Sequence, residues 1–281
     1  MQEFTDRVAV VTGGASGIGF GLASAFAAQR MKIVLADIEA PALSEAVGKL
    51  EAGGAEVLGV RTDVSDAEQV QRLADAAVDR FGAVHVLCNN AGVGAGGLSW
   101  EVPLDTWEWV LGVNLWGVIH GVRSFVPILM QQPEAHVVNT ASVAGLVAGP
   151  FMGPYNASKH AVVAISETLH HEMALMAPHV HVSVLCPGWV RTRIAESARN
   201  RPDSPGNVAE ANAGFAQVLA PLIDNGMPPA AVAATVLAAI HSEQFWILPH
   251  DESEEFWVGF VNKRAQSLVD RANPTIQTPL R

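Results

Sequence analysis

The only tyrosine of the chain, Tyr155, stands four residues before Lys159. Residues at i and i+4 share one face of a helix, and the segment 155–176 has helical periodicity after Pro154, which suits a first turn. A free phenol has a pKa near ~10 and is a poor base at neutral pH. An ammonium group about 4 Å away contributes about 4 kcal/mol at an effective dielectric constant near 20, enough to lower that pKa to roughly 7. The pair could therefore move a proton to or from an alcohol oxygen.

The pattern Tyr-x-x-x-Lys occurs by chance in many proteins, so the functional interpretation of this pair depends on two further side chains. Ser142 ends a strand-like run and precedes Tyr155 by 13 residues, and its hydroxyl could hold a substrate oxygen. Asn114 lies in a strongly apolar helical stretch, where a buried amide needs hydrogen-bond partners. It could anchor a water molecule that leads to Lys159.

A glycine-rich segment, residues 10–21, follows the first strand-like run and opens a helix. Glycines at 13, 17 and 19 would let the backbone turn tightly around a pyrophosphate, which the helix N-terminus favours through its free N–H groups and dipole. The spacing differs from the commoner Gly-x-Gly-x-x-Gly pattern, so a turn that binds nothing remains the alternative.

An acid at the end of the second strand indicates which dinucleotide would bind. Asp37 lies 24 residues after Gly13, where a carboxylate can accept hydrogen bonds from the ribose hydroxyls of adenosine. It would also repel a 2′-phosphate, and positions 36 and 38 hold no Arg or Lys. The pattern favours NAD over NADP, and the alternative is a simple strand-end cap.

The surrounding elements alternate between apolar strands and helices. This order predicts a single α/β domain over residues 1–281, with one Rossmann-type, doubly wound parallel sheet of about seven strands and helices on both faces. Such sheets bind ligands at the carboxyl ends of their strands. The expected strands cover 7–12, 31–37, 55–63, 84–90, 135–142 and 179–188, with a seventh near 245–247; the expected helices cover 19–30, 41–52, 67–81, 104–130 and 155–176.

Two segments stand apart from this alternation. Residues 191–229 include a polar, turn-rich stretch that we interpret as a substrate lid, with a loose surface insertion as the alternative. Residues 250–281 should form a C-terminal helix and tail. The apolar residues of the lid, together with Phe151, Met152 and Trp189, favour a bulky apolar or aromatic substrate.

Composition excludes several classes of function. The chain has 49% hydrophobic and 16% charged residues with a net charge of −11, which argues against nucleic-acid binding. The longest helix-like apolar run, 230–240, falls short of the roughly 20 residues of a membrane span. The two cysteines, Cys88 and Cys186, are expected to be buried free thiols, and the ten histidines show no metal-binding spacing, so we expect no metal. The chain should be a soluble, cytoplasmic protein.

Six motifs in order resemble the short-chain dehydrogenase/reductase family. They are Thr12 to Gly19, Asp63-Val64, Asn89-Asn90-Ala91-Gly92, Asn114, Ser142 with Tyr155-x-x-x-Lys159, and Pro187-Gly188. The resemblance covers roughly residues 5–250. Three segments also resemble a bacterial branch that includes dehydrogenases of lignin-derived aryl alcohols.

The resemblance implies a catalytic tetrad of Asn114, Ser142, Tyr155 and Lys159. It also implies that Asp63 and Val64 flank the adenine, that the Asn90 backbone meets the cofactor ribose, and that Val190 and Thr192 hold the carboxamide. The full set of expected cofactor-binding residues is Gly13, Ser16, Gly17, Ile18, Gly19, Asp37, Asp63, Val64, Asn90, Gly92, Tyr155, Lys159, Pro187, Gly188, Val190 and Thr192.

The expected function is an NAD-dependent oxidoreductase that interconverts a secondary alcohol and a ketone, with a small molecule as its partner. A redox-neutral lyase or epimerase with bound NAD, and a non-enzymatic dinucleotide sensor, remain alternatives. The two long helices around Asn114 and Lys159 carry more apolar faces than one sheet can cover, so we expect a dimer or tetramer, as the resemblance also implies.

Overall fold

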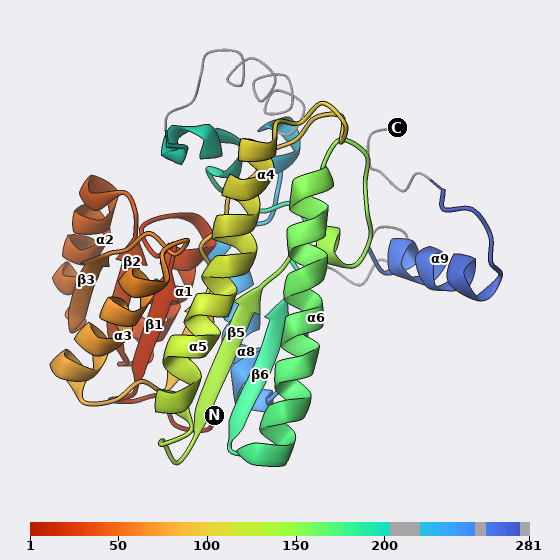
Figure 1. Cartoon of the computed structure of the whole chain (residues 1–281). Helices are drawn as coiled ribbons and strands as arrows, with labels where there is room; N and C mark the ends of the chain where they lie inside the picture. The colour runs from red at the N-terminus through yellow and green to blue at the C-terminus, as the bar shows by residue number, and fades with distance from the viewer. Residues whose placement is uncertain (203–219, 251–256, 276–281) are drawn as a thin grey trace.

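The computed structural model describes residues 1–202, 220–250 and 257–275 and contains one seven-stranded parallel sheet (Figure 1). The spatial order of the strands is β3-β2-β1-β4-β5-β6-β7. Their bounds are β1 Val8–Thr12, β2 Lys32–Asp37, β3 Val57–Arg61, β4 Val86–Asn89, β5 Ala135–Thr140, β6 Val180–Leu185 and β7 Trp246–Ile247. The sequence-based prediction of a doubly wound parallel sheet with about seven strands is confirmed.

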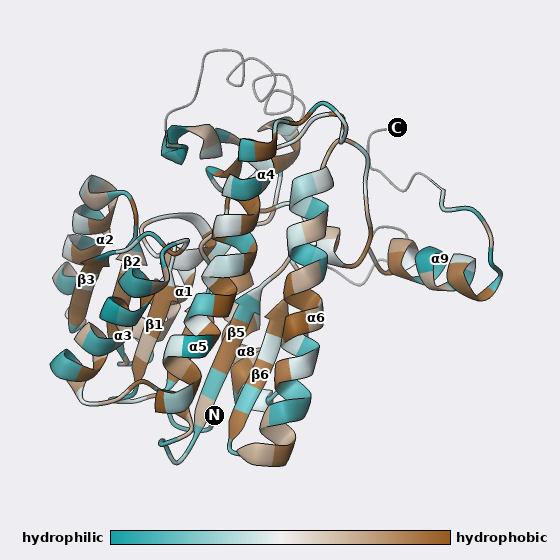
Figure 2. Cartoon of the chain, in the orientation of Figure 1, coloured by the Kyte–Doolittle hydropathy of each residue, from teal (hydrophilic) through white to brown (hydrophobic). Residues whose placement is uncertain are grey.

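Helices cover both faces of this sheet, as Figure 1 shows for the face that carries α3, α5 and α6. The helices are α1 Gly17–Ala28, α2 Ala40–Ala52, α3 Ala67–Phe81, α4 Leu104–Leu111, α5 Gly117–Leu129, α6 Gly153–Met176, α8 Pro229–Ser242 and α9 Trp257–Val269. Figure 2 shows the apolar residues concentrated in the strands and on the helix faces turned toward them.

Alternation along β1 divides the core into two layers. Ala9 and Val11 pack with the cluster that includes residues of α1, α2 and α8. Val8 and Val10 pack with the cluster that includes residues of α3, α5 and α6. All five residues of β1 are buried, because side chains of successive strand residues point to opposite faces and both faces are covered.

The chain changes direction across the sheet between β1 and β4. After β1 it adds β2 and β3 on one side, and it then returns to place β4, β5, β6 and β7 on the other. The carboxyl ends of β1 and β4 therefore lie beside each other, with connections that leave in opposite directions. This switch point is where open α/β sheets form their ligand crevice.

One expected element differs from the structure. The sequence predicted a single helix over 104–130, but a π-helical turn, η1 (Gly112–Trp116), separates α4 from α5. The turn is centred on Asn114, which is completely buried. π turns of this kind often occur at functional sites because the extra residue re-aims a side chain.

The described parts of the segment interpreted as a lid are residues 191–202 and 220–229; residues 203–219 lie outside the described chain. A short 3-10 helix, η3 (Ile194–Asn200), follows β6. In the C-terminal segment, α9 extends away from the body of the molecule (Figure 1). Within the described ranges, no helix is long and apolar enough to cross a membrane.

Candidate active site

A cavity of about 630 Å³ opens at the carboxyl ends of the strands. Of the residues that the sequence assigned to the site, all but two line it. The exceptions are Gly19 and Asn114, which lie behind its wall. The structure thus brings the glycine-rich loop, Asp37, and the Tyr155–Lys159 pair into one continuous space.

The glycine-rich loop has the shape that an approaching phosphate requires. Gly13 and Gly17 have positive φ angles of 63° and 54°, a region that favours glycine. A Cβ atom on Gly19 would lie 2.1 Å from the Gly13 carbonyl oxygen, so this glycine lets α1 pack against the loop. Ser16 makes no side-chain hydrogen bond at the N-terminus of α1, which leaves first-turn N–H groups for an anion.

Hydrogen bonds of Thr12 and Asn90 join the carboxyl ends of β1 and β4. The Thr12 hydroxyl accepts hydrogen bonds from the backbone N–H groups of Asn90 (2.9 Å) and Ala91 (3.1 Å). The Asn90 amide donates to the Thr12 carbonyl oxygen at 3.0 Å. Both side chains are thus engaged in shaping the floor of the cavity.

Asp37, which the sequence predicts to contact an adenosine ribose, lines the cavity at the end of β2. Its two carboxylate oxygens each accept one backbone N–H, from Ala15 and Glu39, both at 3.0 Å. Burial raises the pKa of this carboxyl, and these hydrogen bonds oppose the rise. An ionised carboxylate has about four acceptor positions, so Asp37 retains acceptor capacity for ribose hydroxyls.

Asp63 and Val64 shape the neighbouring wall. The Asp63 carboxylate accepts hydrogen bonds from the backbone N–H (2.9 Å) and hydroxyl (2.7 Å) of Ser65, so it holds a local turn. Val64 is buried, and a Cβ on Gly117 would lie 2.8 Å from its side chain. This turn therefore packs directly on the start of α5.

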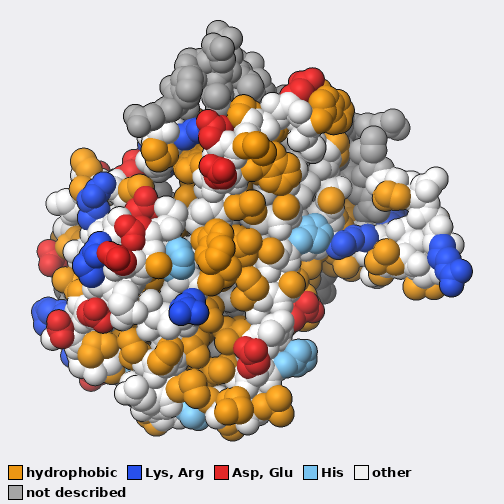
Figure 3. All heavy atoms as spheres, viewed as in Figure 1, with side chains coloured by type: hydrophobic (Ala, Val, Ile, Leu, Met, Phe, Trp, Pro, Cys, Tyr) orange, Lys and Arg blue, Asp and Glu red, His pale blue; other side chains and the backbone are white. Residues whose placement is uncertain are grey.

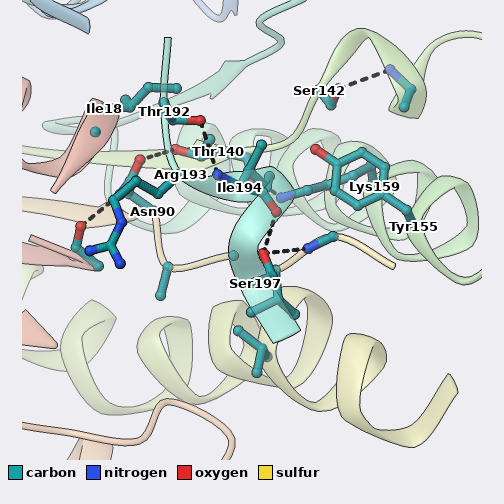
Figure 4. Close-up of a pocket in the computed structure, with 18 of the residues that line it drawn as sticks. Ile18, Asn90, Thr140, Ser142, Tyr155, Lys159, Thr192, Arg193, Ile194 and Ser197 are labelled. Carbon is teal, nitrogen blue, oxygen red and sulfur yellow. Dashed lines mark hydrogen bonds between the residues drawn. The ribbon is translucent and has the colours of Figure 1, made fainter. Parts of the chain in front are cut away.

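Tyr155, Lys159 and Ser142 meet at the other end of the cavity (Figure 4). The Lys159 ammonium lies 5.7 Å from the centre of the Tyr155 ring and donates a hydrogen bond to the Thr140 carbonyl oxygen at 2.8 Å. The Ser142 hydroxyl accepts from the Ala144 N–H at 3.1 Å and donates to the Pro187 carbonyl oxygen at 3.3 Å. The i and i+4 spacing on α6 thus places both side chains in the cavity.

The electrostatics of this pair differ from the sequence-based expectation. Burial raises the pKa of Tyr155, and a side-chain hydrogen bond with Ser142 opposes that rise. Burial also lowers the pKa of Lys159 from 10.5 to about 8. In the chain alone, desolvation outweighs the lowering that we expected from Lys159, so the phenol holds its proton.

Asn114 does not line the cavity, but its side chain forms hydrogen bonds with residues around the site. Its side-chain oxygen accepts the Val93 N–H at 2.8 Å, and its amide donates to the Val93 carbonyl oxygen at 3.0 Å and to the Ser158 hydroxyl at 3.1 Å. The expectation that a buried amide here needs partners is confirmed. The bonds join η1 to α6 and to the loop after β4.

Much of the cavity lining is apolar. Phe151, Met152 and Trp189 line the cavity, as the sequence predicted, and Val93, Trp109, Val147, Leu222 and Ile223 line it as well. Phe151 has a positive φ of 64°, which is uncommon for a bulky residue. The loop before α6 is therefore held in a specific conformation at the cavity mouth.

Sequence reasoning missed a group of charged and polar residues in the cavity lining. Glu39, Arg193, Arg199 and Asn200 also line the cavity. Arg199 and Asn200 lie on η3, within the segment interpreted as a lid, whereas Glu39 follows β2. No local motif marks them, because the contact joins residues about 160 positions apart in the chain.

Neither cysteine lines the cavity, although Cys186 lies close enough to Lys159 to interact with its charge. Cys88 and Cys186 are buried free thiols, as expected, and burial raises the pKa of Cys186 to about 12. Among the described residues, no three His, Cys, Asp or Glu side chains gather as a metal site.

Comparison with known proteins gives consistent matches. A family model described as short chain dehydrogenase matches residues 7–203. A CLA biosynthesis dehydrogenase/reductase from Lactiplantibacillus plantarum is 35% identical over 259 residues, covering 90% of this chain and 91% of that protein. A C alpha-dehydrogenase from Sphingobium sp. is 33% identical over 282 residues, covering 99% and 90%. A solved short chain dehydrogenase/reductase from Burkholderia phymatum in complex with NAD superposes with a TM-score of 0.93 at 46% identity, covering 100% of both chains.

Proposed function

The chain belongs to the short-chain dehydrogenase family, and from that membership we propose that it is an NAD-dependent oxidoreductase that interconverts a secondary alcohol and a ketone. One observation carries the proposal: a single cavity joins the glycine-rich loop and Asp37 at one end to Ser142, Tyr155 and Lys159 at the other. A dinucleotide held by the first group would present its reactive ring to the second.

The residues at the first end fit NAD. The free N–H groups at the start of α1 suit a pyrophosphate, and Asp37 suits ribose hydroxyls while repelling a 2′-phosphate. NAD supplies the hydride acceptor when the alcohol is oxidised, and its reduced form supplies the hydride when the ketone is reduced.

Tyr155 is the group that transfers the proton. In the reducing direction its protonated phenol donates to the oxygen of the ketone as negative charge develops there. In the oxidising direction it accepts the proton of the alcohol. The Ser142 hydroxyl, fixed by Ala144 and Pro187, orients the substrate oxygen.

Lys159 supplies the positive charge that makes the reverse transfer feasible. With a pKa of about 8 it is mostly protonated at pH 7, although it is only 3% exposed. A buried ammonium interacts strongly with a developing phenolate because little solvent screens the pair. Asn114 acts through Ser158 and Val93 as a positioning residue for this end of α6.

The substrate is proposed to be a bulky apolar or aromatic secondary alcohol. Trp109, Trp189, Phe151 and Met152 surround the space beside Tyr155 and offer few polar partners. Burial of apolar substrate surface against these side chains would provide the binding free energy. The name of the Sphingobium relative, C alpha-dehydrogenase, is consistent with an alcohol oxidation.

The test is to follow NADH formation with a panel of aromatic and alicyclic secondary alcohols, for the wild type and for Tyr155→Phe. We expect turnover in the wild type and a loss of at least about 10²-fold in the variant, since general acid–base catalysis contributes about 10²–10⁴-fold. NADH affinity, measured by fluorescence titration, should stay within about twofold. A fully active variant would contradict the proposal.

The same measurements separate the two other functional classes. A lyase or epimerase would consume substrate without net NADH formation. A dinucleotide sensor would bind NADH tightly and turn over nothing on a broad panel. The Tyr155–Lys159 arrangement favours the oxidoreductase, because a sensor does not need a phenol beside a buried ammonium. Cytoplasmic location stays a prediction.

A further inference from the structure

A short segment after β6 crosses the cavity that contains the proposed site. We call residues 193–201 the strap; it consists of η3 and one residue on each side. Arg193, Ile194, Ser197, Arg199 and Asn200 of the strap all line the cavity (Figure 4 shows Arg193, Ile194 and Ser197). None of the proposed catalytic residues lies in the strap, so a catalytic role does not account for its contacts.

One end of the strap is fastened to the loop after β2 by a charged cluster. The Glu39 carboxylate accepts hydrogen bonds from Arg199 Nε at 2.9 Å and from Asn200 Nδ2 at 3.0 Å. Arg199 Nη2 lies 2.7 Å and Arg193 Nη1 3.9 Å from the same carboxylate. The hydrogen bond from Arg199 is the main cause that holds the pKa of Glu39 below its ordinary value, so the pair is ionised at neutral pH.

The strap is fastened to the opposite wall as well. The Ser197 hydroxyl accepts a hydrogen bond from the Gly94 N–H at 3.0 Å, and Ser197 is 3% exposed. Arg201 Nη2 lies 2.7 Å from Asp105 Oδ1, and its guanidinium stacks over Trp109 at 5.8 Å. The strap therefore bridges the wall that carries Asp37 and the wall that follows β4.

The Glu39 side chain does not cap the adjacent helix, whereas its backbone N–H donates a hydrogen bond to Asp37. Glu39 occupies the N-cap position of α2 but makes no side-chain cap hydrogen bond there. The side chains of Glu39 and Arg199 are 24% and 26% exposed, and the hydrogen bond that joins them lies at the protein surface. Because both partners are ionised and Arg199 meets the carboxylate through two of its nitrogens, this contact is stronger than a neutral hydrogen bond.

We propose that Glu39 is a positioning residue that fastens the strap across the dinucleotide end of the cavity and thereby slows cofactor release. The inference rests on the proposed function, since it takes the ligand to be a dinucleotide that extends from Asp37 to Tyr155. A ligand beneath the strap leaves after the Glu39 cluster opens, so the strength of this cluster sets the dissociation rate.

The direct test is the NADH dissociation rate of Glu39→Gln. Stopped-flow mixing of the NADH complex with excess NAD, followed by energy transfer from tryptophan to NADH, measures this rate. The variant keeps the shape of the side chain and loses its charge. We expect dissociation to become about tenfold faster, the effect of weakening one hydrogen bond between charged groups.

A matched control variant distinguishes the loss of the Glu39 contacts from the mere loss of one negative charge near the cofactor. Glu196→Gln removes one negative charge from the strap itself, where the Glu196 carboxylate pairs with Arg193 at 3.0 Å and is 63% exposed. Loss of a negative charge near an anionic cofactor would by itself slow release. We expect the dissociation rate of this control to stay within about twofold of the wild type.

A second measurement uses the protein without cofactor. Trypsin can cut the bond between Arg199 and Asn200, whereas Arg201 precedes proline and resists cleavage. Cleavage at Arg199, identified by mass spectrometry, should be faster in Glu39→Gln than in the wild type and in Glu196→Gln. Equal NADH release and equal cleavage in all three proteins would overturn the inference. Failure of the wild type to bind NADH would instead refute the proposed function.

Discussion

Replacing Lys159 with methionine should abolish activity and at the same time make the fold more stable at neutral pH. Lys159 is 3% exposed, and burial lowers its pKa from 10.5 to about 8. At about 1.36 kcal/mol per pKa unit, keeping this ammonium charged in the folded chain costs roughly 3 kcal/mol. A methionine side chain of similar length avoids that cost.

The loss of one contact offsets part of the expected gain in stability. The variant loses the hydrogen bond from Lys159 Nζ to the Thr140 carbonyl oxygen at 2.8 Å. A hydrogen bond from a charged donor contributes about 1.5 kcal/mol, so the net gain in unfolding free energy at pH 7 is about 1.5–2 kcal/mol. Activity should fall by at least about 10²-fold, because the charge beside Tyr155 is gone.

The difference in unfolding free energy between the variant and the wild type should change with pH in a defined direction. The folded pKa of Lys159 lies below its unfolded value, so the wild type gains stability as pH rises from about 8 to about 10.5. The variant lacks that gain. The stability difference between the two proteins should therefore shrink as pH rises through this window and reverse near its middle, where the wild type has recovered about 1.5–2 kcal/mol.

Urea unfolding, followed by tryptophan fluorescence at pH 7 and pH 10 without cofactor, measures this difference. Lys49→Met is the matched control, since Lys49 is 60% exposed, pairs with Glu45 on α2 and lies 5.9 Å from the centre of the Phe20 ring. Its urea midpoint should not change. A Lys159→Met protein that is less stable than the wild type at pH 7, or a difference that is equal at both pH values, would refute the reasoning.

Three shorter predictions concern the cofactor loop, the acid after β2 and the exposed apolar surface. Gly19→Ala would place a Cβ 2.1 Å from the Gly13 carbonyl oxygen and should abolish NADH binding in a fluorescence titration, whereas Gly48→Ala, with nothing within 4 Å, should bind normally. Asp37→Asn should raise the KM for NAD about tenfold and reduce the preference over NADP, measured as the ratio of kcat/KM values; an unchanged ratio would count against the role of Asp37. Trp116 of η1, between α4 and α5, is 52% exposed, and apolar side chains gather on the face that carries α4, α5 and α6 (Figure 3). The wild type should therefore be a dimer or tetramer by light scattering, and Trp116→Lys should dissociate it; a monomeric wild type would contradict this expectation.

Most of the fold could be predicted because its signals are local. Strands buried on both faces read as continuous apolar runs, and the helix over Ala67–Phe81 has the predicted bounds because Asp66 caps its start and Gly82, with φ of 79°, ends it. The π turn at Asn114 could not be predicted, since its residues have ordinary helical periodicity. The turn coincides with hydrogen bonds of Asn114 with Val93 and Ser158, which are distant in the sequence and leave no local signal.

The candidate site likewise combines residues that could be predicted from the sequence with residues that could not. The glycine-rich loop, Asp37 and the Tyr155–Lys159 pair were predicted from spacing within single elements, and the family resemblance is confirmed by the matches to relatives. Glu39 and Arg199 were missed, because ion pairs between distant loops leave no periodic signal. The raised pKa of Tyr155 in the cofactor-free chain was also not predicted, because spacing shows that a lysine is near but not how strongly both groups are desolvated.

Gly92 shows how the buried polar groups are brought together. The sequence assigned this glycine to cofactor binding, and it does line the cavity. A Cβ at this position would lie 3.4 Å from the Asn114 side-chain oxygen and 3.6 Å from Lys159 Nζ. Both polar atoms therefore face the same small space, which only a residue without a side chain leaves open. This arrangement supports the expectation that Asn114 and Lys159 act together, since a water molecule in that space would have an acceptor and a donor within reach.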